Sequence, residues 1–380
     1  MYFKRQIPLS ETFKRKSVLL LGPRRTGKSA LIRHELKGCK IYNLLESDVF
    51  LRLSRNQAWI RESLTPHDKL IVIDEIQKLP SLMDEVHTMI EEFGVRFLLT
   101  GSSARKLRRS YTSLMAGRAK TLRLFPFVSA EIDDFDLDRV LLYGTLPPIY
   151  LADDPRDELR TYVGDYLKEE IQAEAFSRNI QSFSRFLQRA ALSSGELLNF
   201  ESIGRDAQVP PRTIREYYSV LEDTLIGVML EPLSTQAKRK SISKGKFYFF
   251  DVGVMNALVG NTQLPAGTPA YGTAFEHFIF QELYAYVSYF HPDKTLQFWR
   301  STTHQEVDFV IKDALALEVK ATRLCDAKDF KGLHVFSKEN SVPKCIVVCN
   351  EPTKRKVGTV EIYPYRLFLK ELWEGVLLPQ

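Results

Sequence analysis

The feature that most constrains the fold of this chain is a glycine-rich segment close to its N-terminus. Residues 22–29 read GPRRTGKS and match the phosphate-binding loop pattern G-x-x-x-x-G-K-[ST] in full. An apolar run at 17–21 precedes the motif, and a segment with a helical pattern follows it at 30–37. In such a strand–loop–helix unit, backbone N–H groups and the N-terminus of the helix form a cradle for an anion. The motif therefore predicts a parallel α/β domain that binds phosphate, with a chance glycine-rich turn as the weaker alternative.

The loop is expected to bind ATP together with Mg²⁺. Lys28 can reach the β- and γ-phosphates, and Ser29 can place its hydroxyl on the metal ion. The full set of expected nucleotide contacts in the loop is Gly22, Pro23, Arg24, Arg25, Thr26, Gly27, Lys28, Ser29 and Ala30.

An acidic motif follows the next buried strand. Residues 69–80 read KLIVIDEIQKLP, and the apolar run at 70–73 is typical of a parallel strand that is covered on both faces. Asp74 and Glu75 then lie at the carboxyl end of this strand, where open α/β sheets bind ligands. We expect Asp74 to hold Mg²⁺ and Glu75 to polarise the attacking water. A solvated turn is the alternative, but the upstream phosphate loop favours ATP hydrolysis.

A third strand and a basic segment complete the expected nucleotide site. The strand at 95–100 ends in Thr100, which is a candidate sensor of the γ-phosphate. Six basic and no acidic residues lie between positions 101 and 120. Among them, Arg118 directly precedes a further strand at 119–125, where ring-forming ATPases often offer an arginine to the neighbouring subunit's nucleotide. An ordinary solvated charge is an equally good interpretation of Arg118.

Composition narrows the classes of protein that these motifs can serve. No apolar run approaches the roughly 18 residues that span a bilayer, and the N-terminus lacks a signal-peptide core, so we expect no membrane partner. The four cysteines show no zinc spacing, and we expect Cys345 and Cys349 to be buried thiols in a reducing, cytoplasmic compartment. The formal net charge of +6 permits a nucleic-acid partner without requiring one.

Breaks in the pattern divide the chain into four predicted parts. These are a P-loop ATPase core (1–127), a helical lid (128–180), a middle part (181–265) and a C-terminal part (266–380). An acidic stretch at 131–138 is expected to be helical and to open the lid.

The middle part predicts three helices and then a β-hairpin. Helical patterns cover 183–191, 201–207 and 212–221, and apolar strands at 226–230 and 247–250 enclose a basic loop. This order is that of a winged helix-turn-helix, in which the third helix enters the major groove of DNA. The expected DNA contacts are Arg212, Thr213 and Arg215, with Tyr217 as a further candidate, and the hairpin residues Lys238, Arg239, Lys240, Lys244 and Lys246. A winged helix that serves as a protein–protein spacer is the alternative.

The C-terminal part predicts a long helix, 271–290, that contains Glu276, and three strands at 296–300, 306–311 and 315–320. A three-residue loop between the last two strands pairs Phe309 with Leu317 and places Asp308 directly opposite Glu318. A two-residue loop would mix polar and apolar side chains on each face, which the two-residue period of strands disfavours.

These acidic residues predict a second cation site. Asp308 and Glu318 can hold Mg²⁺ or Mn²⁺ and activate a water for phosphodiester hydrolysis, with Lys320 two residues beyond Glu318. Glu276 can complete the shell of the metal. The spacing of Asp308, Glu318 and Lys320 is a weak pattern by itself, and an exposed sheet face with alternating charges is the alternative.

Taken in order, these motifs resemble a known prokaryotic family of AAA+-like ATPases that combine an N-terminal ATP-binding domain with a C-terminal domain of the DUF4143 type. The matching segments are 22–29, 71–80, 98–107, 114–127, 246–258 and 274–283, so the resemblance extends over essentially the whole chain. It implies an AAA+ core, a winged helix and a C-terminal domain similar to PD-(D/E)xK nucleases. The nuclease-like positions match as Glu276, Asp308, Glu318 and Lys320, with Val307 in place of the proline that names the superfamily.

The predicted fold class is α/β: a P-loop AAA+-like parallel-sheet domain with a helical lid, then a winged helix-turn-helix, then an α/β nuclease-like domain. Two functions remain open. The first is a homo-oligomeric ATPase, arranged as a hexameric ring, that binds duplex or branched DNA and couples hydrolysis to translocation or remodelling. Its C-terminal domain would cut the DNA or only grip it. The second is an ATP-dependent switch whose non-catalytic nuclease-like domain binds a protein partner.

Overall fold

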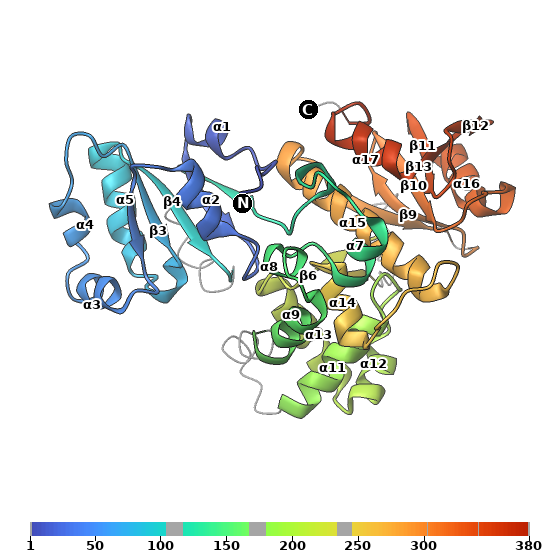
Figure 1. Ribbon diagram of the computed structural model, residues 1–380, viewed down its shortest axis with the longest axis horizontal. Helices are drawn as coiled ribbons and strands as arrows, with labels where there is room; N and C mark the ends of the chain where they lie inside the picture. Colours follow the sequence, from blue (N-terminus) through green and yellow to red (C-terminus); the bar gives the residue numbers. More distant parts are fainter. Residues whose placement is uncertain are drawn as a thin grey trace. The chain divides into compact units, whose positions relative to one another are not determined.

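The computed structural model describes residues 2–103, 117–166, 180–233, 245–301, 303–340 and 342–378. These residues divide into two compact units, each built around a β-sheet (Figure 1). The first unit comprises Met1–Pro126 with Asp223–Ile226, and the second comprises Phe127–Glu222 with Gly227–Gln380. The finer division of the chain into four parts stays a prediction.

In the described part of the first unit, five strands form a parallel sheet in the order β2-β3-β4-β1-β5. Their bounds are β1 Ser17–Leu21, β2 Lys40–Asn43, β3 Leu70–Asp74, β4 Arg96–Gly101 and β5 Ala119–Arg123. All residues of β1, and all but the first of β3 and of β4, are buried, as expected for central strands of a parallel sheet. The predicted parallel α/β domain is therefore confirmed.

Helices of the first unit cover this sheet. They are α1 (Leu9–Phe13), α2 (Lys28–Glu35), α3 (Ser47–Arg55), α4 (Trp59–Glu62) and α5 (Leu82–Phe93), with a 3₁₀ turn, η1, at Ile76–Lys78. On one face, Leu53 of α3, Ile60 of α4 and Val86 of α5 pack with Ile73 and Leu99 of the strands in one buried cluster. The register pairs Leu21 of β1 with Gly101 of β4, so the carboxyl ends of the central strands lie along one edge.

The second unit begins with helices. In chain order they are a 3₁₀ turn (Ser129–Glu131), α7 (Leu137–Tyr143), α8 (Pro147–Tyr150), α9 (Pro155–Thr161), a π-helical turn (Tyr162–Tyr166), α11 (Ile180–Leu192), α12 (Phe200–Ala207) and α13 (Pro211–Asp223). The expected acidic helix over 131–138 is wrong. Asp136 instead caps α7, since its carboxylate accepts hydrogen bonds from the backbone N–H groups of Asp138 and Arg139.

Strands β6 (Gly227–Leu230) and β7 (Lys246–Phe249) follow α13 and pair antiparallel. The three helices α11, α12 and α13 and this strand pair therefore occur in the predicted order. Their core is aromatic: the ring of Tyr218 on α13 lies 4.9 Å from those of both Phe186 on α11 and Phe247 on β7. Such edge-to-face contacts fix helices and strands against one another.

In the remaining described part of the second unit, six strands form a mixed sheet in the order β12-β13-β11-β10-β9-β8. Their bounds are β8 Leu296–Arg300, β9 Glu306–Ile311, β10 Leu315–Lys320, β11 Lys344–Cys349, β12 Arg355–Val357 and β13 Val360–Pro364. The antiparallel pair β9–β10 joins Ile311 with Leu315 and Phe309 with Leu317. The predicted three-residue loop and these pairings are confirmed, whereas the pairing of Asp308 with Glu318 stays a prediction.

Helices of the second unit cover both faces of this mixed sheet. They are α15 (Pro269–Phe290), α16 (Lys331–Glu339) and α17 (Tyr365–Trp373), with a 3₁₀ turn, η4, at Ala327–Phe330. The helix α14 (Val252–Val259) packs instead against α7 and α11. Phe336 of α16 packs with Val310 and Ala316 on one face. On the other face, Phe280 of α15 lies 6.0 Å from the ring of Phe309. Glu276 of α15 is therefore carried on the side of the sheet opposite to α16.

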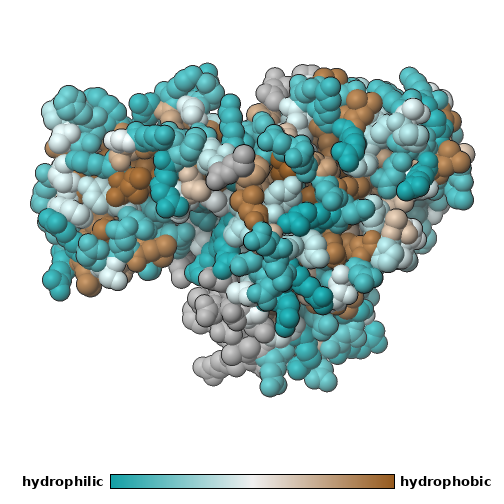
Figure 2. Space-filling model, viewed as in Figure 1, coloured by the Kyte–Doolittle hydropathy of each residue, from teal (hydrophilic) through white to brown (hydrophobic). Residues whose placement is uncertain are grey.

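The visible surface is mostly hydrophilic, with apolar side chains in small separate groups (Figure 2). Within the described ranges, no helix is long and apolar enough to cross a bilayer.

Candidate functional site

Two glycines of the phosphate loop are required by its backbone. A Cβ on Gly22 would lie 2.6 Å from the carbonyl oxygen of Leu124, a separation that real side chains do not show. Gly27 has φ = 95°, a left-handed conformation that glycine adopts without strain. Because α2 begins at the next residue, its N-terminal amides stay close to the loop, as an anion cradle requires.

Lys28 and Thr26 are bonded within the loop itself. The Lys28 ammonium is buried and donates to the carbonyl oxygens of Gly22 at 2.7 Å and Pro23 at 3.1 Å. The Thr26 hydroxyl donates to the same Pro23 carbonyl at 2.9 Å. The cation is therefore held inside the loop that would surround the phosphates.

Arg5 is a member of this site that the sequence did not reveal. Its buried guanidinium donates to the carbonyl oxygens of Thr26 at 2.8 Å, Phe125 at 2.6 Å and Pro126 at 3.2 Å. It thus ties the N-terminal segment and the segment after β5 to the phosphate loop. No motif could have revealed Arg5, because its partners are backbone carbonyls distant in the sequence.

Ser29, Asp74 and Thr100 are brought together by the strand order, since β4 lies between β1 and β3. The Ser29 hydroxyl donates to Asp74 Oδ2 at 3.0 Å, and the Thr100 hydroxyl donates to Asp74 Oδ1. Hydroxyl and carboxylate oxygens are the ligands that Mg²⁺ prefers, so this pair of side chains fits the ion. Ser29 and Asp74 would hold Mg²⁺ beside the phosphate loop.

Glu75 follows in an uncommon backbone conformation, with φ = 62° and ψ = 46°. Left-handed backbone at a residue other than glycine is concentrated at functional sites. Its N–H donates to the Thr100 hydroxyl at 3.0 Å. Its carboxylate accepts hydrogen bonds from Gln77 and from the Ser102 hydroxyl, the latter at 3.5 Å. The backbone and side chain of Glu75 are therefore both fixed relative to Asp74.

Arg118 lies at the opposite end of the sheet from the phosphate loop. Its carbonyl accepts from the N–H of Ser17, the first residue of β1, whereas the loop follows the last. A five-residue strand is about 16 Å long. The Arg118 side chain is partly exposed and forms an ion pair with Glu91 of α5. Both predicted interpretations, an arginine offered to another subunit and a surface charge, remain compatible with this position.

A second constellation lies in the other unit, where Glu276, Asp308, Glu318 and Lys320 meet. Asp308 Oδ2 accepts from the backbone N–H of Val319 at 2.9 Å, so its side chain reaches across to β10. The Lys320 ammonium lies 2.6 Å from Glu318 Oε1. Asp308 and Glu318 are both 7% exposed, which excludes the alternative of an exposed charged sheet face.

Electrostatics in this cluster favour protons on two of the carboxylates. Burial, and then repulsion from Asp308, raise the pKa of Glu276 to about 7 and that of Glu318 to about 8. Burial alone would lower the pKa of Lys320, but Asp308 and Glu318 raise it above its ordinary value. Glu276 and Glu318 therefore bind protons more readily than ordinary carboxylates do near neutral pH.

The donor set fits a divalent cation. Glu318 Oε2 is buried and has no hydrogen-bond partner within the ranges that the structure covers. A buried acceptor without a partner is rare in proteins and often marks a place where an ion or water binds. Asp308 and Glu318, with Glu276, would hold Mg²⁺ or Mn²⁺ through oxygen ligands.

Lys246 and Tyr248 belong to the same cluster, although the sequence placed Lys246 on an exposed basic hairpin. That prediction is wrong: Lys246 is buried, with its ammonium 2.5 Å from Glu306 Oε1 and 3.9 Å from Glu276 Oε1. The Tyr248 hydroxyl donates to Glu276 Oε1 at 2.7 Å. The period of two along β7, which places Lys246 and Tyr248 on one face, could have indicated a shared environment.

Of the predicted DNA contacts, Arg212 and Arg215 lie exposed on α13. Arg212 is 90% exposed and 3.4 Å from Glu216, and Arg215 lies 5.2 Å from the ring of Phe200. Thr213 is half-buried on the same helix, and Lys238, Arg239, Lys240 and Lys244 lie outside the described residues.

The prediction that Tyr217 faces a DNA groove is wrong. Its ring is buried 4.8 Å from that of Phe183 and 5.1 Å from that of Phe186, both on α11. Tyr217 is therefore part of the aromatic core between the helices.

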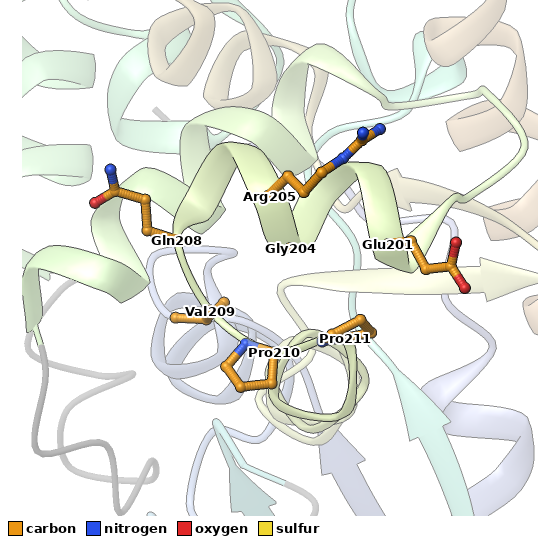
Figure 3. Close-up of a pocket in the computed structure, with 7 residues that line it drawn as sticks. All are labelled: Glu201, Gly204, Arg205, Gln208, Val209, Pro210 and Pro211. Atoms are coloured by element: carbon orange, nitrogen blue, oxygen red, sulfur yellow. The ribbon is translucent and has the colours of Figure 1, made fainter.

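A cavity of about 480 Å³ lies at the turn between α12 and α13 (Figure 3). Its lining residues are Glu201, Gly204, Arg205, Gln208, Val209, Pro210 and Pro211. A Cβ on Gly204 would lie 2.7 Å from the carbonyl oxygen of Val209, so glycine allows the tight turn. The lining contains one acid and one base, both on α12, and no set of converging catalytic groups.

The buried cysteines form a cluster that does not fit a metal. Cys345 and Cys349 are buried as predicted, and Cys325, Cys349 and Glu351 lie within 4.8 Å of one another. However, both oxygens of Glu351 are bound by Arg355, at 2.7 and 2.8 Å. The carboxylate is thus neutralised by a bidentate ion pair and is not available to a cation.

Comparison with known proteins identifies family relationships for three stretches of the chain. Residues 14–132 match the family described as AAA domain. Residues 134–264 and 271–368 match two families described as domains of unknown function, DUF8612 and DUF4143.

Relatives that match most of the chain are distant in sequence. Uncharacterized proteins of Mycobacterium tuberculosis and Mycobacterium bovis are each 25% identical over 304 residues, which is 78% of this chain and 67% of theirs. An uncharacterized protein of Haemophilus influenzae is 23% identical over 298 residues, 70% of this chain and 73% of its own.

Solved structures add little. One similar structure is a signal transduction ATPase with numerous domains (STAND) protein from Pyrococcus horikoshii, which has a tetratricopeptide repeat sensor. It is 15% identical, the match covers 74% of this chain and 48% of that one, and the TM-score is 0.23. The DNA clamp loader delta protein of Bacillus subtilis is 11% identical, with 56% and 86% covered and a TM-score of 0.22. Scores this low carry no argument about the fold or the function. From the family matches, this chain joins an AAA domain, of the P-loop ATPase kind, to a C-terminal DUF4143 domain.

Proposed function

We propose that this protein is an oligomeric ATPase that binds DNA and couples ATP hydrolysis to translocation or remodelling of the DNA. The observation that carries the proposal is the hydrogen-bonded set of Ser29, Asp74 and Thr100 beside the phosphate loop. Phosphoryl transfer to water depends on positioning and on electrostatic stabilisation, and this set provides both at one sheet edge.

Each residue of this site has a separate role in the proposed hydrolysis of ATP. Loop amides and Lys28 bind the phosphates, with Lys28 exchanging the carbonyls of Gly22 and Pro23 for phosphate oxygens. Mg²⁺, when bound, neutralises charge that develops on the phosphates. Glu75 orients the attacking water and accepts its proton. Thr100 keeps Glu75 in place relative to Asp74, since it is bonded to both residues.

Two surface features support action between subunits and on DNA. Arg118 lies at the sheet end away from its own phosphate loop, where a second copy of the chain, in a hexameric ring, can receive it. Arg212 and Arg215 are exposed on α13, the helix that would enter a DNA groove. The hairpin lysines and arginine of 238–240 would add contacts to phosphates, which carry no sequence information.

A second activity, metal-dependent cleavage of DNA, is supported by one specific observation. Glu318 Oε2 is buried and has no hydrogen-bond partner among the described residues, and it lies in a cluster with Asp308 and Glu276, which is a donor set for a divalent cation. In this activity Lys320 would bind the scissile phosphate.

The first experiment measures the steady-state ATPase rate of the full chain with single-stranded, duplex and four-way-branched DNA at two salt concentrations. Strong, salt-sensitive stimulation supports a DNA-dependent ATPase, because phosphate contacts weaken as salt rises. A flat response would instead favour the ATP-dependent switch that binds a protein partner. Lys28→Ala serves as the inactive control.

The nuclease activity is tested separately by nicking of plasmid DNA in Mg²⁺ or Mn²⁺. We expect nicking to persist in Lys28→Ala and to vanish in Asp308→Ala. Asp293→Ala is the matched control, since Asp293 is an exposed carboxylate of the same unit. Nicking that survives Asp308→Ala would show contamination or another site, and a complete lack of nicking would leave a domain that only binds.

A further inference from the structure

We infer that Gln77 positions the attacking water together with Glu75, an inference that rests on the proposed ATP hydrolysis. Gln77 lies in the 3₁₀ turn η1, two residues after Glu75. Nothing in the phosphate-loop pattern or in the Asp74–Glu75 pair requires a glutamine at this position.

The orientation of the Gln77 amide follows from its partners. Its Nε2 donates to Glu75 Oε2, and also to the Ser102 hydroxyl at 3.2 Å. An ionised carboxylate only accepts hydrogen bonds, so the nitrogen of the amide must face Glu75. The amide oxygen, Oε1, is thereby directed away from Oε2 of Glu75.

Gln77 Oε1 is buried and has no hydrogen-bond partner in the part of the chain that the structure describes. Buried polar atoms of this kind are few in native proteins, and a catalytic role or a bound water is among the explanations for them. Gln77 and Ser102 both donate to Oε2 of Glu75, so these bonds leave the other carboxylate oxygen, Oε1, for a further partner. One acceptor on each residue is thus suited to a shared water.

The rest of the site fixes this pair of acceptors. Glu75 is held in the left-handed region, and its N–H is bonded to Thr100, which in turn is bonded to Asp74. Ser102, 3% exposed at the end of β4, anchors the Gln77 amide from the other side. The acceptors therefore keep a set position relative to the residues expected to hold Mg²⁺.

A water that donates one hydrogen to Glu75 Oε1 and the other to Gln77 Oε1 has its lone pairs directed away from both. As the water oxygen bonds to the γ-phosphorus, the bond from that phosphorus to the bridging oxygen breaks, and ADP leaves with the electron pair. Glu75 takes the proton that the water loses. Gln77 takes none, because an amide is not basic enough, so its contribution is to orientation alone.

The same contacts permit an opposite arrangement, in which Gln77 holds Glu75 away from the water. The two arrangements predict changes of opposite sign. Removing a water-positioning amide lowers kcat, whereas removing a restraint on Glu75 raises it.

The test compares the full-length wild type with Gln77→Leu, Gln77→Asn and a control, Gln57→Leu. Gln57 is a glutamine of the same unit whose amide donates to Ser81 on the surface. The measurements are kcat and KM for ATP, with the Kd of a fluorescent ADP analogue as a check on the folded site. We expect Gln77→Leu to lower kcat by about 10²-fold, the loss typical of a misplaced reactant, with KM and Kd within twofold of wild type.

Gln77→Asn shortens the side chain by one methylene and should lose nearly as much of kcat while it keeps the polarity of the site. If Gln77→Leu fails to bind ADP, the inference is tested by the kcat of Gln77→Asn instead. An unchanged or increased kcat at normal Kd in the deciding variant would overturn the inference while the proposed ATPase stands. A wild type without any ATPase activity would overturn the proposed function and the inference with it.

Discussion

Replacement of Lys246 by methionine should destabilise the second unit by about 3 kcal/mol, because this side chain is the buried counter-charge of two carboxylates. Only 4% of it is exposed, and its ammonium lies 2.5 Å from Glu306 and 3.9 Å from Glu276. Glu306 keeps a second ion pair, with Arg300 at 2.8 Å, so most of the loss falls on Glu276. At an effective dielectric constant of about 20, two unit charges separated like Lys246 and Glu276 attract each other by about 4 kcal/mol. The cost of removing the ammonium from water is subtracted from this attraction.

The assay is urea unfolding followed by tryptophan fluorescence. Trp299 and Trp373 lie in the second unit, whereas Trp59 lies in the first, so a Trp59→Phe background reports on the second unit alone. Lys246→Arg is the matched control, since it keeps the charge, and it should recover most of the lost free energy of unfolding. A loss below 1 kcal/mol in Lys246→Met would refute the assignment of Lys246 as the counter-charge.

The pH dependence separates charge from packing. Burial and Asp308 raise the pKa of Glu276 to about 7, and Lys246 opposes this rise. Glu276 attracts Lys246 only when it is ionised, so the stability that Lys246 contributes is present above this pKa and is lost as pH falls through about 7. The effect of Lys246→Met should therefore be large at pH 8.5 and smaller at pH 5.5. An equal effect at both values would attribute it to lost contact with the ring of Phe298, which lies 5.5 Å from the ammonium.

Three further predictions concern the proposed ATPase. Lys28→Ala should weaken nucleotide binding, whereas Glu75→Gln should bind ATP but stall hydrolysis; equal losses of affinity, measured by titration with an ATP analogue, would undo these roles. Arg118→Ala should abolish ATPase activity at near-normal nucleotide affinity, and activity that persists would leave Arg118 as a partner of Glu91 only. Charge reversal over 238–240 should weaken DNA binding and flatten its dependence on salt concentration, and an unchanged slope would remove the hairpin from the DNA contacts.

The strands were the most predictable part of the fold. Those at 17–21, 296–300, 306–311 and 315–320 have the predicted bounds, because apolar runs or a two-residue period end there at polar or turn residues. The helix predicted over 131–138 is wrong, because a composition that suits a helix does not show at which residue the helix begins. The side chain of Asp136 caps the N-terminus of α7 and so determines where this helix begins. Aspartate side chains bond to nearby backbone N–H groups, which favours aspartate at helix caps over helix interiors.

Site residues were predictable where a motif or a register fixed them. The loop length at 312–314 was enough to place Asp308 beside β10. Lys246 was misjudged because a lysine next to a basic loop ordinarily faces solvent, and only the tertiary contact with Glu276 and Glu306 reverses that expectation. Gln77 could not be predicted from the sequence either, because its proposed role depends on which atoms its amide nitrogen and amide oxygen contact in the fold.

The two candidate cation sites differ in what their carboxylates now bind. Asp74 accepts hydrogen bonds from two uncharged hydroxyls, so a cation that enters there meets no opposing charge from them. In the second site the Lys320 ammonium occupies Glu318 Oε1, and a cation at Glu318 would be repelled by it. A DNA phosphate would attract Lys320 away from Glu318 and so relieve this repulsion, while the cation would in turn attract the phosphate. Because such linkage is reciprocal, the arrangement favours joint binding of a cation and a phosphate over binding of either alone.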